Sequence, residues 1–232
     1  MLPTLSFRAS TPTPNPWPLT PNPLFLPDDD GLVPLTDTEW FDDDATHRLV
    51  EFISVAWDAA HLEDNLTFLA SNLSPKKNES SRETIRRYLC DSFFKDHLQT
   101  YKKRPIYWLF SSGKQKAFQC LVYLHRYNEG TLSRMRSEYV IPLQGKMAAR
   151  LESLQSDMQA ATSTAHSKGL ERERAKLEKQ QTELLAFDEK LRHYADRRIS
   201  LDLDDGVKVN YGKFGDLLAE VKAVHGKKAE EA

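Results

Sequence analysis

The sequence predicts a mainly α protein with a small β element (α+β), in which a helical globular part carries an antiparallel coiled-coil hairpin. Three observations lead to this fold class. Apolar residues recur at helical spacing through most of the 232 residues, leucines recur every seven residues in the last third, and apolar–polar alternation is confined to two short stretches. No stretch approaches the roughly 20 apolar residues that a membrane-spanning helix needs, so we expect no membrane partner.

Proline dominates the first 27 residues, which hold eight of the twelve prolines in the chain. Proline fixes φ and has no amide donor, so this segment is predicted to be extended or disordered, and so is the tail at 226–232. A linker or a misplaced start is the favoured interpretation, ahead of a ligand for a proline-binding domain.

The expected compartment is the cytoplasm. Prolines interrupt the N-terminus before the apolar core of a signal peptide is able to form. The chain has two cysteines, Cys90 and Cys120, which are too few for a disulfide framework and lack the spacing of metal ligands.

Residues 28–142 are expected to form a helical or α+β region. Pro105 ends the last of its predicted helices, and the apolar run 106–110 is typical of a short buried strand. The next apolar segment, 117–127, fits either a helix or a strand. The helices predicted from apolar periodicity cover about 45–57, 61–73 and 83–98, the last with Ile85, Leu89, Phe93 and Phe94 turned inward.

Pro142 is expected to separate this region from two heptad runs. The first run starts at Leu143, and the second has leucines at 170, 177, 184 and 191. Joined by a turn of small residues over 163–169, the runs predict an antiparallel coiled-coil hairpin over 143–198. Behind it, residues 199–225 are expected to form a β-hairpin over 199–211, turning at Asp204-Asp205-Gly206, and a short closing helix over 214–224.

Charge is strongly polarised along the chain, although the net charge is only −2. Residues 28–64 hold twelve acidic residues and one basic residue, whereas residues 82–136 hold twelve basic and four acidic residues. Two interpretations are open. Either the two segments neutralise each other within one fold, or the basic segment contacts phosphate groups.

The sequence contains no catalytic constellation. Nucleophile-elbow, phosphate-loop, dinucleotide-glycine and zinc signatures are all missing. Asp202, Asp204 and Asp205 suggest a metal site, but Asp-Asp-Gly is more typical of a tight turn. We therefore predict no catalytic residue, no metal ligand and no cofactor-binding residue in this chain.

One basic and aromatic stretch is the candidate nucleic-acid contact. Cations bind backbone phosphates, and interleaved aromatic rings stack on exposed bases. Arg104 precedes a conformationally restrained proline, which suits a specific contact, whereas Trp108 shares a predicted strand face with apolar neighbours and is favoured as a core residue. The candidate DNA-binding residues are Lys102, Lys103, Arg104, Tyr107, Trp108, Lys114, Lys116, His125 and Arg126.

Several sequence blocks, in a fixed order, resemble those of a known family. The blocks are DTEWF at 37–41, FFKDH at 93–97, YKKRPIYWLFSS at 101–112, LHRY at 124–127 and LDDGVKVNY at 203–211. From about residue 27 to residue 220, the chain resembles the C-terminal region of the PglX family, the adenine-specific DNA methyltransferases of type 1 BREX (bacteriophage exclusion) systems.

The resemblance implies a DNA-recognition or docking role in phage defence. In that family an N-terminal half transfers a methyl group from S-adenosylmethionine to adenine, and C-terminal elements recognise DNA. The Asn-Pro-Pro-Tyr-type motif and the glycine-containing cofactor loop of the catalytic half are absent from this sequence. We therefore expect this chain to be inactive alone and to hold no cofactor, S-adenosylmethionine being expected for the full-length parent enzyme.

The implied partners are duplex DNA and either a separate methyltransferase polypeptide or other BREX components. A competing hypothesis does without nucleic acid. In it, the chain is a helical coiled-coil scaffold that binds a partner protein, and its basic stretch only neutralises its acidic stretch.

Overall fold

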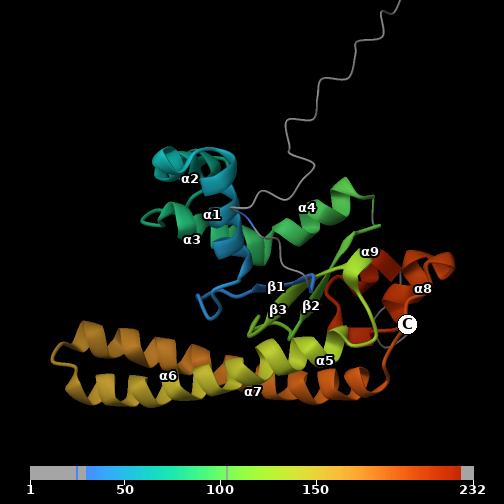
Figure 1. Ribbon diagram of the computed structural model, residues 1–232. Coiled ribbons are helices and arrows are strands. Elements are labelled where there is room, and N and C mark those ends of the chain that lie inside the picture. The colour runs from blue at the N-terminus through green and yellow to red at the C-terminus, as the bar shows by residue number, and fades with distance from the viewer. Residues whose placement is uncertain (1–24, 26–29, 103, 226–232) are drawn as a thin grey trace, which may run out of the picture.

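The computed structural model describes residue 25, residues 30–102 and residues 104–225. Apart from Phe25, the predicted proline-rich segment at 1–27 lies outside the described residues, and so do Lys103 and the tail at 226–232. The described chain is mainly helical with one small antiparallel sheet, which confirms the predicted fold class. Helices lie on both sides of this sheet (Figure 1).

The sheet has three strands in the order β1–β3–β2. They are β1 (Leu32–Leu35), β2 (Tyr107–Ser111) and β3 (Gln119–Tyr123). β3 is central and antiparallel to both neighbours, and Tyr107 of β2 lies opposite Tyr123 of β3. The segment 117–127 therefore contains a strand rather than a helix. No sequence pattern pointed to β1, which contains Pro34 and is an edge strand, where a proline is tolerated.

Four helices form the layer on one side of the sheet (Figure 1). They are α1 (Ala45–Ala56), α2 (Leu62–Ser71), α3 (Ser81–Asp91) and α4 (Phe93–Thr100), with a short 3₁₀ turn, η1 (Ala59–His61), before α2. The prediction of one helix over 83–98 is wrong, because Ser92 separates two helices, α3 and α4. Ile85 of α3 packs in a small cluster with α1 and α2, whereas Phe94 of α4 packs in the main core, and one straight helix does not serve both.

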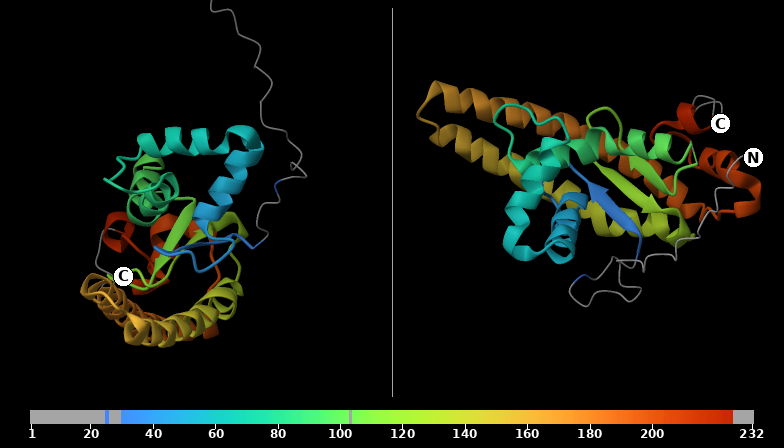
Figure 2. Two further views of the ribbon diagram at one scale, coloured as in Figure 1. Left: turned by 90° about the vertical axis from the view of Figure 1, so that its left-hand side faces the viewer. Right: turned by 90° about the horizontal axis from the view of Figure 1, so that it is seen from above.

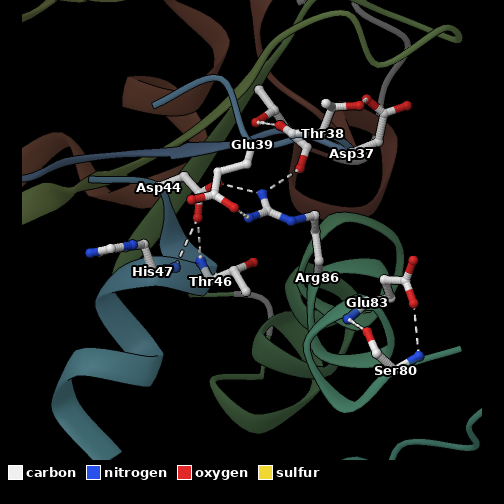
Figure 3. A network of polar contacts seen from close by, with 10 residues as sticks. Asp37, Thr38, Glu39, Asp44, Thr46, His47, Ser80, Glu83 and Arg86 are labelled. Carbon is white, nitrogen blue, oxygen red and sulfur yellow. Dashed lines mark hydrogen bonds and ion pairs between the residues drawn. The ribbon is translucent and has the colours of Figure 1, made fainter. Parts of the chain in front are cut away.

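Arg86 joins α3 to the start of α1 (Figure 3). Its guanidinium contacts the carboxylate of Asp44, which is only 1% exposed, and donates a 3.1 Å hydrogen bond to the Thr36 carbonyl. The same carboxylate caps α1 by accepting 2.9 Å hydrogen bonds from the backbone N–H groups of Thr46 and His47. One buried ion pair therefore connects the acidic and basic segments.

A long helical hairpin covers the other side of the sheet. One arm is continuous from α5 (Thr131–Met135) through the π-helical η3 (Arg136–Val140) into α6 (Ile141–Ala160), and the other arm is α7 (Thr164–Asp196). The closed end of the hairpin extends well beyond the sheet (Figure 2). The predicted heptad leucines of α7, at 170, 177, 184 and 191, are all buried.

Two details of the hairpin differ from the prediction. The connection is only 161–163, because Ser163 caps α7 by accepting a 3.1 Å hydrogen bond from the His166 N–H. Pro142 does not interrupt the helix either. Just before Pro142, the Ile141 N–H donates a hydrogen bond to the carbonyl of Arg136, five residues earlier. This wider, π-helical turn leaves room for the proline ring and does not require a hydrogen bond from the proline nitrogen.

The predicted β-hairpin over 199–211 is wrong. The structure has a 3₁₀ turn, η4 (Leu203–Asp205), followed by the helix α8 (Gly206–Gly212). Tyr211 and the following Phe214 both pack edge-on against Trp108, with ring centroids 5.2 and 5.7 Å apart. Helical spacing brings both rings to the same partner. In a strand, Val209 and Tyr211 would lie on the same face, but Val209 is exposed and Tyr211 is buried.

The predicted closing helix over 214–224 is also replaced. The chain forms a 3₁₀ turn, η5 (Gly215–Leu217), an extended stretch, and the short helix α9 (Val221–His225). In the extended stretch, Leu218 forms an isolated bridge with Phe110, and the Ala219 N–H donates a 2.8 Å hydrogen bond to the Leu109 carbonyl. Backbone pairing with the edge of β2 therefore takes the place of the predicted helix in this stretch.

Histidine 97 ties α4 to β2. Its Nε2 accepts a 3.2 Å hydrogen bond from the Tyr107 N–H, and its ring stacks near Phe93 and Phe94. Burial lowers the pKa of His97. Because only the neutral imidazole offers an acceptor at Nε2, protonation would break the bond to β2.

Truncation of Trp108 should strongly destabilise the fold. The side chain is 2% exposed, so Trp108→Ala is expected to lower the free energy of unfolding by about 3–5 kcal/mol. Urea denaturation followed by circular dichroism measures this change. Trp57→Ala is the matched control, because Trp57 is 48% exposed and its loss should cost within about 0.5 kcal/mol. Equal losses in the two variants would contradict the packing described here.

Stability should fall as the pH drops through the range in which an unfolded histidine titrates. The folded state resists protonation of His97, so between its lowered pKa and the ordinary value near ~6.5 the unfolded state binds more protons. Urea denaturation at a series of pH values measures the slope. His97→Gln keeps an acceptor but does not titrate, and its profile should be flatter. Identical profiles in parent and variant would show that His97 does not contribute.

Candidate nucleic-acid interface

The candidate residues divide between the two ends of the β2–β3 hairpin. Lys102 and Arg104 lie in the loop that leads into β2, and His125 and Arg126 follow β3 in the 3₁₀ turn η2 (Leu124–Arg126). Because the strands are antiparallel, these four residues share one end of the sheet. All four are exposed.

Lys114 and Lys116 lie at the opposite end, in the loop that connects β2 to β3. Five strand residues separate the two ends, a span of roughly 13 Å. Lys116 forms an ion pair with Asp91 and donates a 3.2 Å hydrogen bond to the Cys90 carbonyl, so it holds this loop against α3. The single basic patch predicted from the sequence is therefore not continuous.

The two aromatic candidates differ in exposure. Trp108 is buried, and its Nε1 donates a 3.2 Å hydrogen bond to the Pro105 carbonyl. Its ring is not available to stack on a base, and it anchors the loop that carries Arg104. Tyr107 is half-buried beside Tyr123, with ring centroids 5.2 Å apart, and burial raises its pKa. Tyr107, Tyr123 and Arg126 line a hollow of about 420 Å³.

Two further hollows adjoin the loop before β2. One, of about 670 Å³, is lined by Lys102 and Arg104, by residues 205–208 at the start of α8, and by Val224 of α9. The other, of about 430 Å³, is lined by Lys95, Leu98 and Gln99 of α4, by Lys102, and by Glu220 and Ala223. The two hollows share Lys102, and each includes one of two consecutive residues of α9, so they adjoin each other. We call the adjoining hollows the basic groove, after Lys95, Lys102, Arg104 and Lys208.

The backbone around the basic groove turns sharply at three positions. Lys102, Gly206 and Glu220 have φ values of 49°, 76° and 55°, all in the left-handed region. A non-glycine residue costs about 1–2 kcal/mol in this region, so the surroundings hold Lys102 and Glu220 there. Backbone hydrogen bonds close both turns, from the Arg104 N–H to the Tyr101 carbonyl and from the Ala223 N–H to the Glu220 carbonyl.

Much of the basic segment forms ion pairs. Several cations of the chain pair with the acidic segment, which supports mutual neutralisation for those residues. In contrast, within the part of the chain that the structure describes, none of the four groove cations forms an ion pair. The pairs that reach the acidic segment include Arg82 with Glu63, Arg86 with Asp44, Arg134 with Asp30, and Lys176 with Asp37.

Two groove cations were missed by the sequence analysis. Lys95 lies on α4, and Lys208 lies on α8, inside a segment predicted as a strand. Both belong to blocks that carry the family resemblance, and Lys95 lies in the basic segment, but neither is part of the basic and aromatic stretch that supplied the candidates. Only the tertiary contacts bring them beside Lys102 and Arg104.

The aspartates at 202–205 lie in the 3₁₀ turn that leads into α8, not in the turn of the predicted β-hairpin. The Asp202 carboxylate accepts a 2.9 Å hydrogen bond from the Asp204 N–H, and Asp205 pairs with Lys213 at 3.5 Å. Over residues 30–102 and 104–225, no cluster of three or more His, Cys, Asp or Glu side chains is placed to hold a metal ion. Every helix in the same ranges is too short or too polar to cross a membrane.

Comparison with known proteins gives a consistent result. No family model matches the chain. It is 58% identical over 211 residues to the adenine-specific methyltransferase BrxX of Escherichia coli O9:H4 (strain HS), and 41% identical over 200 residues to the adenine-specific methyltransferase PglX of Lacticaseibacillus casei (strain Zhang).

These matches cover 89% and 85% of this chain but only 17% of each relative. Identity of this level over most of the chain is far above chance, and it confirms the resemblance expected from the sequence blocks. The chain is thus homologous to one part of the BrxX and PglX adenine-specific methyltransferases and spans about a sixth of their length.

Proposed function

We propose that this chain is a DNA-contacting segment of a BREX-type adenine-specific methyltransferase, equivalent to its C-terminal region, and that it does not itself transfer the methyl group. The observation that carries the proposal is the basic groove, whose cations make no ion pair within the described chain. Relatives that are adenine-specific methyltransferases by name make DNA the appropriate polyanion.

The chemistry of the groove suits phosphate. Lysine ammonium groups act as compact charges toward phosphate oxygens, and an arginine guanidinium offers a planar pair of donors. Contacts of this kind position a protein on duplex DNA without reading its sequence. The cations also displace condensed counterions, which makes the binding strongly dependent on salt.

Arg104 is the best placed of the groove cations to read a base. Its neighbour Pro105 is buried and fixed through the hydrogen bond from Trp108. Little backbone freedom is therefore lost when Arg104 engages a ligand. An arginine held this way is able to donate two hydrogen bonds to the major-groove edge of guanine, which discriminates against other bases by about 1–3 kcal/mol.

Removal of two groove charges should weaken DNA binding. The parent is expected to bind duplex DNA with a non-specific Kd of about 10⁻⁴ to 10⁻⁶ M. The double variant Lys102→Ala/Arg104→Ala should bind all sequences more weakly and lower the slope of log K against log salt concentration by about one to two. Fluorescence anisotropy of a labelled duplex, measured from about 50 to about 200 mM salt, gives both quantities.

The matched control removes the same charges elsewhere. Lys168→Ala/Arg172→Ala also takes away one lysine and one arginine, both exposed, near the start of α7 at the closed end of the hairpin and away from α8 (Figure 1). Its binding should match that of the parent. If the Lys102/Arg104 variant also matches the parent at every salt concentration, the groove does not contact DNA, and the scaffold hypothesis is favoured.

The chain alone should not methylate DNA. The Asn-Pro-Pro-Tyr-type motif and the glycine-containing cofactor loop are missing from its sequence. Incubation with tritiated S-adenosylmethionine and duplex DNA is expected to leave adenine unlabelled. Label that appears only after addition of a separately expressed catalytic part of a BrxX relative supports the proposal. Label transferred by the chain alone would contradict it.

A further inference from the structure

The start of α8 forms a wall of the basic groove that faces the loop before β2. Tyr211 holds α8 in place, because its ring packs on Trp108 and its hydroxyl donates a 2.5 Å hydrogen bond to the Ala219 carbonyl. Asn210 fixes the first turn by donating a 3.0 Å hydrogen bond to the Gly206 carbonyl. The wall is therefore rigidly attached to the same tryptophan that anchors the loop of Arg104.

Lysine 208 lies on this wall. It is exposed, it lines the groove together with Lys102 and Arg104, and no ion pair involves it in the described part of the chain. Cations therefore stand on both walls. Val224 and Ala223 of α9 add apolar surface to the lining of the two hollows. Cationic side chains beside an apolar surface are able to bind the phosphate oxygens of a strand and to contact its less polar sugars.

Two carboxylates, Asp205 and Glu220, also line the groove, and only one of them forms an ion pair among the described residues. Asp205 is paired with Lys213 at 3.5 Å, so its charge is largely compensated. Glu220 is exposed and lines the groove beside Lys95 and Lys102, and no ion pair involves it among the described residues. A phosphate that enters the groove would meet this negative charge.

We propose that the groove holds the sugar–phosphate backbone of one strand of duplex DNA between α8 and the loop before β2, with Lys208 as a phosphate-binding residue and Glu220 as a carboxylate that limits affinity. This inference rests on the proposed function and deepens it. It assigns a role to two residues that were not among the DNA-binding candidates of the sequence analysis.

Substitutions at the two residues should have opposite effects. Lys208→Ala is expected to weaken duplex binding about three- to tenfold at low salt and to lower the salt slope by about one. Lys208→Arg should retain binding, because it keeps the charge. Glu220→Gln should strengthen binding about two- to fivefold, an effect that disappears as salt screens the charge. Anisotropy of a labelled duplex measures all three variants.

Lys222→Ala is the matched control, since Lys222 is exposed on α9 but does not line the groove. Its binding should equal that of the parent. If the parent binds DNA and the Lys102/Arg104 variant does not, but Lys208→Ala behaves like Lys222→Ala, the inference is overturned and the proposed function stands. If the parent does not bind duplex DNA at any salt concentration, both fail. Thermal melts by circular dichroism confirm that each variant is folded.

Discussion

The packing of Tyr211 and Phe214 against Trp108 is the contact on which the candidate site depends. The three rings meet edge to face at the sheet and are almost completely buried. Trp108 Nε1 donates a hydrogen bond to the Pro105 carbonyl, which fixes the loop of Arg104. The ring of Tyr211, which packs on Trp108, fixes the position of α8. Residues from distant parts of the sequence thus form two walls of one groove.

A second constraint divides the charges of the chain. The buried pair of Arg86 and Asp44 joins α3 to α1, and loss of Arg86 would leave the buried Asp44 carboxylate without its counter-charge. Further pairs to the acidic segment involve arginines of α3 and α5. Mutual neutralisation therefore applies to these arginines, and contact with phosphate is the proposal for the groove. Lys95, Lys102, Arg104 and Lys208, which line the groove, belong to none of the ion pairs found among the described residues.

Under the proposed function, the segment that contacts DNA is separate from the part of the enzyme that transfers the methyl group. The chain spans 17% of each relative, so the remainder of such an enzyme would supply the methyl-transfer site. A groove of lysines and one restrained arginine is suited to holding a duplex in register. Its affinity for DNA would depend on the attraction of the groove cations and the repulsion of Glu220. Of the two carboxylates that line the groove, Glu220 is the one without an ion pair among the described residues.

Local periodicity was enough to predict α1, α2 and the two long arms of the helical hairpin, but not the interruption at Ser92 or the helix α8. The heptad leucines of α7 are buried as expected, because a repeat along one helix face does not depend on distant residues. Two of the four groove cations, Lys102 and Arg104, were also identified from the sequence. Which end of the sheet each would occupy was not visible, since that follows from the antiparallel pairing of β2 with β3.

The segment 199–211 was decided by tertiary structure alone. Its alternating pattern favours a strand, yet Val209 is 52% exposed, and Tyr211 is buried against a tryptophan far away in sequence. Burial of an aromatic ring in a preformed core outweighs a weak local preference for strand. For the same reason Lys208 joins the groove, and β1 pairs with β3 despite its proline. Periodicity is a property of neighbours in sequence, whereas these contacts depend on partners that only the folded chain brings together.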